Sequence, residues 1–167
     1  MVVTIRIPEN LARRVRELGV DIESLVIEVI AKELRLDPAE VAEAHLELAE
    51  KFLEEGRGLV DKDSVQASEK LYKAAEECVK ALATLYNLKD VLSSVRSRGR
   101  WSISDLERAA EAISDRLGTW FYDAWDHAWV LHAWGFHEAR LDSRAVKRRL
   151  PYIERIIEAT RRAVRGS

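Results

Sequence analysis

Three histidines, His127, His132 and His137, are the residues whose type and spacing come closest to a chemical site. Histidine can bind a metal ion or transfer protons near neutral pH. Each is five positions from the next, so successive imidazoles on an α-helix are rotated by about 140° and cannot meet on one metal ion. We therefore predict no metal and no cofactor. His132, His137 and Glu138 remain candidates for acid–base residues of a pocket, with a buried hydrogen-bonded network as the alternative.

Arginines recur in two segments and could contact the phosphate groups of RNA or DNA. One segment is the loop around Gly99, and the other is residues 143–167, which hold eight basic and two acidic residues. The arginines concerned are Arg96, Arg98, Arg100, Arg144, Arg148, Arg155, Arg162 and Arg165. Residues 37–66 have the opposite balance, with three basic and nine acidic residues. The pattern therefore fits either phosphate binding or ion pairing between these regions, within one chain or between subunits.

The overall composition limits the class of protein. The chain has 167 residues, of which 34% are charged, and a net charge of −2. Asn, Gln, Met and Cys are almost absent, a bias typical of thermophilic proteins. Cys78 is the single cysteine, which excludes an intrachain disulfide and a cysteine-cluster zinc site. No apolar run reaches the length of a membrane-spanning helix, so we predict a cytoplasmic protein that does not bind membranes.

The longest amphipathic pattern covers residues 64–86. Leu71, Ala75, Cys78 and Leu82 recur at spacings of three and four, so they lie along one side of a helix. A second apolar stripe lies beside the first, and so wide an apolar face must be covered by other helices. The pattern predicts a mainly α protein with an antiparallel helical bundle.

Capping residues and breaks predict the other helices of the bundle, which we assign to residues 37–167. Asp37 and Pro38 open a helix that we expect to stop at Gly56. A second capping box begins at Ser104, an aromatic helix covers about residues 120–138, and Pro151 divides the last segment into two helices. We expect the segment before Trp101 to end in a mobile connection.

Residues 1–36 form a separate unit with a different pattern. The first seven residues, MVVTIRI, alternate in the two-residue period of a half-buried strand, and Pro8 ends it. Two amphipathic helices follow, separated by Gly19. A lone strand leaves both edges unpaired, and pairing with a second copy would satisfy them. We therefore predict that this unit is a dimerisation arm and that the protein is a homodimer.

The arm resembles the ribbon-helix-helix family in its order of strand, proline, helix, glycine-containing turn and second helix. The resemblance implies that paired strands enter the DNA major groove, with Val2, Thr4 and Arg6 reading bases and Ser24 near phosphate. However, residues 1–36 hold six basic and six acidic residues, so the positive excess that drives phosphate binding is missing. DNA binding and dimerisation alone are both consistent with this arm.

Three motifs in the bundle resemble the archaeal PaREP family: ASEKLYKAAEECVKALA, an isolated Trp101, and LHAWGFHEARL. The resemblance covers roughly residues 40–160 and implies a bundle related to HEPN domains and to the C-terminal domain of kanamycin nucleotidyltransferase. HEPN ribonucleases carry an arginine followed closely by a histidine. Here Arg116 precedes His127 by eleven positions, so ribonuclease chemistry is not carried over.

These observations predict a non-enzymatic homodimer whose arm dimerises and is the candidate for DNA binding. The alternative is a HEPN-like module that docks on a nucleotidyltransferase or on RNA, in a system of the toxin–antitoxin type. A third hypothesis is an enzyme that uses the helix rich in tryptophan and histidine.

Overall fold

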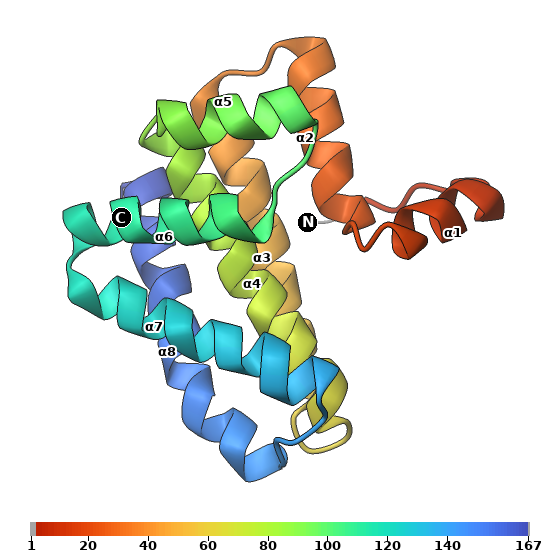
Figure 1. The fold of residues 1–167 in the computed structure, drawn as a ribbon, viewed down its shortest axis with the longest axis vertical. Helices are drawn as coiled ribbons and strands as arrows, with labels where there is room; N and C mark the ends of the chain where they lie inside the picture. The colour runs from red at the N-terminus through yellow and green to blue at the C-terminus, as the bar shows by residue number, and fades with distance from the viewer. Residues whose placement is uncertain (1–2, 167) are drawn as a thin grey trace.

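The computed structural model describes residues 3–166, and these form helices and connecting turns with no strand among them (Figure 1). The mainly α fold is therefore confirmed. The helices are α1 (Glu9–Glu17), α2 (Ile22–Leu34), α3 (Pro38–Leu59), α4 (Ser64–Leu85), α5 (Lys89–Arg98), α6 (Ile103–Leu117), α7 (Thr119–Val130), the π-helix η1 (Leu131–His137) and α8 (Ser143–Arg165). Among the described residues, no helix combines the length and apolar character that crossing a membrane requires.

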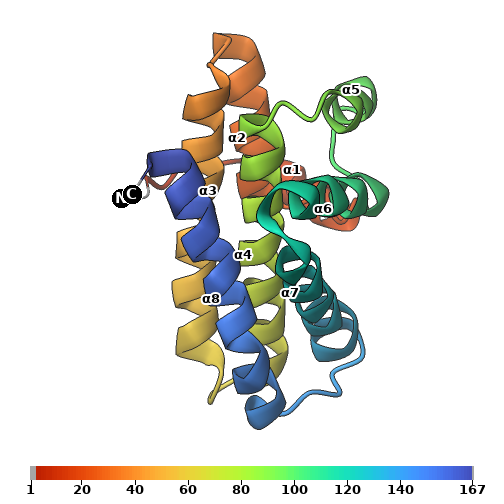
Figure 2. The ribbon, with the colours of Figure 1, turned by 90° about the vertical axis from the view of Figure 1, so that its left-hand side faces the viewer.

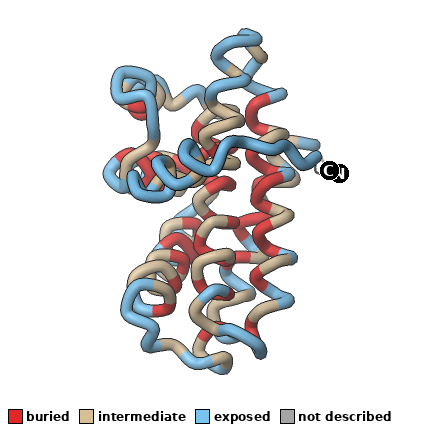
Figure 3. Tube along the Cα trace, turned by 90° about the vertical axis from the view of Figure 1, so that its right-hand side faces the viewer, coloured by how far each residue is buried: buried red, intermediate tan, exposed pale blue. Residues whose placement is uncertain are grey.

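Helix α4 is the centre of the bundle. It forms an antiparallel hairpin with α3, and α8 packs along both of them (Figure 2). Helices α6, α7 and η1 cover the other side of α4. Buried positions accordingly follow α3 and α4, whereas the arm and α5 are largely exposed (Figure 3).

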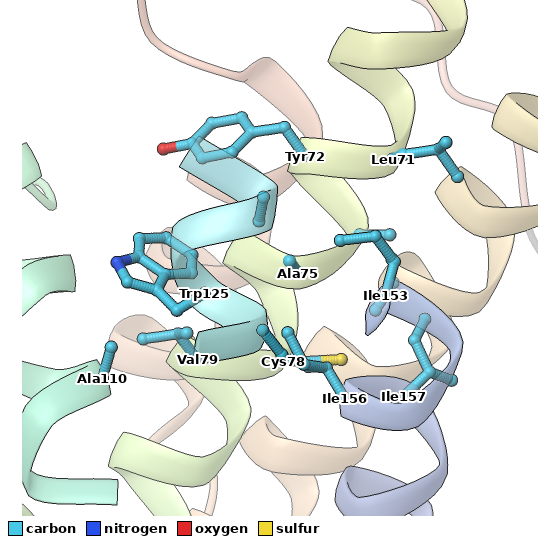
Figure 4. Close-up of a cluster of buried hydrophobic side chains, with 14 of the residues drawn as sticks. Leu71, Tyr72, Ala75, Cys78, Val79, Ala110, Trp125, Ile153, Ile156 and Ile157 are labelled. Atoms are coloured by element: carbon cyan, nitrogen blue, oxygen red, sulfur yellow. The ribbon is translucent and has the colours of Figure 1, made fainter. Parts of the chain in front are cut away.

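The core lies where α4 meets α7 and α8 (Figure 4). Tyr72 and Val79 lie on the side of α4 toward Trp125 of α7, while Cys78 lies toward Ile156 of α8. Burial raises the pKa of the Cys78 thiol to about 12, so this cysteine is an unreactive core residue. The predicted apolar face of residues 64–86 is therefore confirmed.

The predicted strand at the N-terminus is wrong for the part that the structure describes. Residues 3–8 have no regular secondary structure, and Val3 and Ile5 are 82% and 63% exposed. A strand exists only when a neighbouring strand accepts and donates its hydrogen bonds, and the described chain supplies no second extended segment. The two predicted helices of the arm do form, and α2 leaves Val29 and Leu34 exposed.

Several helix boundaries also differ from expectation. Helix α3 does not stop at Gly56 but continues through it. This glycine lets α3 pack closely on α4, because a Cβ there would lie 2.7 Å from Leu71. The expected mobile connection contains α5, and α6 begins at a capping box formed by Ser102 rather than Ser104. Pro151 lies inside the continuous helix α8 and does not divide it.

Candidate functional site

The polar side chains of α4 form two groups that face different elements. In its C-terminal half, Lys80 and Glu77 face α2 and α3. In its N-terminal half, Glu69 faces η1. Both groups belong to one motif singled out in the sequence, residues 67–83, and they are the two candidate sites of this chain.

The first group is a buried ion-pair cluster around Lys80. Its Nζ donates to Ser24 Oγ at 2.8 Å and lies 3.0 Å from carboxylate oxygens of both Glu76 and Glu77. Burial disfavours the ammonium, but the two carboxylates outweigh it and raise the Lys80 pKa. Burial also opposes the charge of Glu77, yet Lys80 and His45 lower its pKa to about 2. Both partners therefore keep their charge at neutral pH.

His45 extends this cluster toward the arm. Its Nδ1 lies 2.6 Å from Glu77 Oε2, and its Nε2 lies 2.9 Å from Glu28 Oε1 of α2. Burial favours the neutral imidazole, but these two carboxylates prevail and raise the pKa of His45. The indole of Trp101 donates to the same Glu28 oxygen at 3.3 Å. The isolated tryptophan of the sequence motifs thus holds the loop before α6 against the arm.

A cleft of about 310 Å³ opens between α2, α4 and the α5–α6 loop, above this cluster. Its lining includes Ser24, Lys80, Arg98, Arg100 and Trp101. Ser24 and Lys80 are placed like a nucleophile and its base, but the raised pKa keeps Lys80 protonated and unable to accept a proton. Lys80 is therefore not a base for Ser24 in this cleft.

Further polar contacts join the arm to the bundle, where Ile27 of α2 also packs against the core. Besides the bonds of Ser24 and Glu28, Lys73 Nζ of α4 lies 2.7 Å from Asp21 Oδ2 at the start of α2. Lys51 of α3 lies 2.7 Å from Glu23. Because the two last pairs are partly exposed, salt weakens this docking more than it weakens the apolar core.

The His45 cluster predicts a pH-dependent contribution to stability. A histidine whose pKa in the folded state exceeds the usual 6.5 contributes fully to stability at lower pH and loses that contribution as pH rises through the folded pKa. We expect the difference in unfolding free energy between wild type and His45→Gln to be larger at pH 6 than at pH 9.5, measured by urea denaturation.

His127→Gln is the matched control for this experiment. Burial and the nearby Arg149 lower the pKa of His127. The contribution of His127 to the unfolding free energy of wild type therefore falls as the pH decreases. The two variants should therefore show opposite pH slopes. A His45→Gln difference that stays constant across this range would contradict a protonated His45.

The second group brings two of the three spaced histidines together. His137 Nε2 lies 3.1 Å from His132 Nε2, and His132 Nδ1 lies 2.9 Å from Glu69 Oε2. The expectation that these rings diverge is wrong because residues 131–137 form a π-helix, whose wider turn places positions i and i+5 on one face. His127 does lie apart, stacked 3.7 Å from the ring of Tyr152.

The neighbours of this pair explain two further motif residues. A Cβ on Gly135 would lie 2.3 Å from Ser68 Oγ, so only glycine lets η1 approach α4 this closely. The Tyr72 ring packs 4.2 Å from the His132 ring. Glu138, expected in the same pocket, instead pairs with the exposed Arg140 at 2.9 Å.

Half of the candidate phosphate-binding arginines already have partners within the chain. Arg165 lies 2.6 Å from Glu43 and 3.0 Å from Glu50, both in the acidic region of α3. The others are Arg98 with Asp105, Arg162 with Glu158, and Arg155 over the ring of Trp120. Within residues 3–166, no ion pair involves Arg96, Arg100, Arg144 or Arg148. The basic C-terminal helix thus largely pairs with the same chain.

The structure describes three of the four residues proposed to contact DNA. Val2 lies outside the described residues. Thr4 and Arg6 are exposed in the irregular N-terminal segment. Ser24 is buried and accepts a hydrogen bond from Lys80.

Comparison with known proteins identifies the family. The pattern of the archaeal PaREP1/PaREP8 family matches residues 44–157. The chain belongs to this family. None of the curated proteins compared with this chain matches it.

Solved structures of a relative support the PaREP1/PaREP8 fold. A crystal structure of a protein from Sulfolobus solfataricus is 35% identical, with a TM-score of 0.64, and covers 69% of this chain and 94% of its own. A solution structure of the same target is 35% identical, with a TM-score of 0.57, and covers 73% of this chain and 89% of its own. The family match begins beyond the arm, whose residues 1–36 lie outside it.

The sequence reasoning missed the cluster that joins the arm to this PaREP1/PaREP8 bundle. Lys80 lies on the side of its helix opposite the predicted apolar stripe, yet it is buried. One available signal was Glu77, a charge next to the buried Cys78. Charges that flank a buried position require a polar partner from a neighbouring element.

Proposed function

We propose that the protein is a non-enzymatic homodimer whose subunits are joined by the N-terminal arm. The observation that carries this proposal is the unpartnered apolar surface of the arm, which projects from the bundle (Figure 1). No residue of α1 is buried. The exposed apolar side chains of this surface are Val3, Ile5, Ile7, Leu11 and Leu18.

The electrostatics of the arm favour a second copy over a nucleic acid as the occupant of this surface. Equal numbers of basic and acidic residues in residues 1–36 give neither mutual repulsion nor a strong attraction to phosphate. A twofold contact sets the same apolar residues of two arms against one another, which is the commonest arrangement of homodimers.

The ion-pair cluster supports the non-enzymatic part of the proposal. Lys80 is held charged by Glu76 and Glu77, and Glu77 by Lys80 and His45. Neither Lys80 nor Glu77 changes its protonation state near pH 7. The cluster therefore serves to dock the arm in a fixed orientation on the bundle.

Charged substitutions in the arm test dimerisation in the full-length chain. We expect the double variant Ile5→Asp, Leu11→Asp to dissociate into monomers, measured by sedimentation equilibrium. Burial of each aliphatic side chain contributes about 1.5–3 kcal/mol, so the double change weakens the dimer by more than about a hundredfold. Both residues are exposed in the single chain, which leaves the subunit fold intact.

Trp134→Asp is the control, because Trp134 is an exposed apolar residue of the bundle and not of the arm. It should leave the dimer unchanged. If wild type sediments as a monomer at micromolar concentrations, the proposal is rejected and the apolar surface belongs to a different partner, such as a nucleotidyltransferase. If wild type and the double variant are equally dimeric, the bundle and not the arm joins the subunits.

A further inference from the structure

The π-helix η1 creates a pair of histidines that an α-helix of the same sequence would separate. His132 and His137 are five residues apart, and the i to i+5 hydrogen bonding of η1 aligns them on one face. Short π-helical segments of this kind occur frequently at functional sites. Neither the docking of the arm nor the core requires the outer imidazole, since His137 is exposed.

The geometry of the pair fits two ligands of one metal ion. Two nitrogens bound to zinc at about 2.0–2.1 Å are separated by about 2.9 Å at a right angle and by about 3.3 Å at a tetrahedral angle. The Nε2 atoms of His132 and His137 are 3.1 Å apart, between these values. Their ring centroids are only 4.5 Å apart, closer than in a straight N–H···N bond, where each ring lies directly behind its nitrogen. The rings are therefore tilted away from the line that joins the two Nε2 atoms.

Glu69 prepares His132 for this role. Its Oε2 lies 2.9 Å from Nδ1 of His132, so the carboxylate accepts the Nδ1 proton and leaves the lone pair on Nε2. This carboxylate–histidine arrangement orients many imidazoles that bind metals. In the metal-free pair, His137 Nε2–H donates to that lone pair, and a bound dication takes the place of the shared proton.

We propose that His132 and His137 chelate a first-row transition-metal dication such as Zn²⁺ or Ni²⁺, and that Glu69 is the positioning residue. Imidazole nitrogens suit these ions, whereas Mg²⁺ and Ca²⁺ prefer oxygen ligands. Within residues 3–166, no group of three or more His, Cys, Asp or Glu side chains could hold an ion. Water or an external ligand completes the coordination, and the exposed position of His137 leaves room for it.

The test uses the full-length chain and the metal ions alone. Titration calorimetry with ZnCl₂ and with NiCl₂ should show one ion bound per chain, and MgCl₂ should give no binding. His137→Ala should abolish saturable binding. Glu69→Gln should weaken it about 10–100-fold, the usual effect of removing the partner of a metal-binding histidine.

His127→Ala is the matched control, because His127 lies one element earlier and stacks on Tyr152. It should bind Zn²⁺ as wild type does. Circular dichroism should show that each variant keeps the helical content of wild type, which the exposed position of His137 favours. The proposal is overturned if His137→Ala keeps the wild-type dissociation constant, or if His127→Ala weakens binding as much as His137→Ala.

Discussion

Replacing Lys80 with methionine is expected to lower the free energy of unfolding by about 3–5 kcal/mol, the usual cost of removing one partner of a buried ion pair. Lys80 is 4% exposed and compensates the carboxylates of Glu76 and Glu77. Methionine fills the same space but leaves Glu76 without its cation and Glu77 with His45 alone. It also removes the donor to Ser24, so the arm loses one of its contacts with the bundle.

Urea denaturation at pH 7 measures this loss, and Lys62→Met is the control because Lys62 is exposed. The control should change stability by less than about 0.5 kcal/mol, as is usual for surface positions. Adding Glu77→Gln to Lys80→Met should recover part of the loss, since the uncompensated charge is then removed. A loss below about 1 kcal/mol for Lys80→Met would show that the cluster is hydrated and weakly coupled.

We expect Trp125→Ala to lower the free energy of unfolding by about 3–5 kcal/mol as well. The ring is 1% exposed and packs 5.9 Å from the ring of Tyr72 at the junction of α4 and α7. Its Nε1 donates to Glu107 of α6 at 2.9 Å, so truncation removes a link among three helices as well as a large apolar volume.

Trp134→Ala provides the comparison for this substitution. Its ring is 56% exposed, so we expect a change below about 0.5 kcal/mol. Thermal unfolding followed by circular dichroism is sufficient to separate the two variants. Equal losses for Trp125 and Trp134 would mean that the junction of α4, α6 and α7 is not the centre of the core.

Local sequence patterns were enough to predict most helices of the bundle. The spacing of Leu71, Ala75, Cys78 and Leu82 places α4 at the centre, and Asp37 caps α3 where expected. These signals are local, because capping and periodicity depend on residues within a few turns of one helix. The same local reasoning failed at Gly56, whose role depends on Leu71 in another helix.

The candidate site was less predictable because its partners are far apart in the chain. The structure places His45 between Glu28 and Glu77. Its two partners lie in different helices, and nothing in the local pattern selects them among the many carboxylates of this chain. Dimerisation through the arm stays a prediction that sedimentation tests, and DNA binding and a partner protein stay predictions.

The sequence by itself determined that this chain is helical, where its main helices begin, and that three motifs characterise its bundle. Only the tertiary structure decided that the N-terminal segment has no strand partner in the described chain, and that His132 and His137 face each other. Helix periodicity is a property of one segment, but hydrogen-bond pairing needs a second segment. The wider turn of η1 likewise accompanies packing against α4, where Gly135 meets Ser68 and His132 meets Glu69.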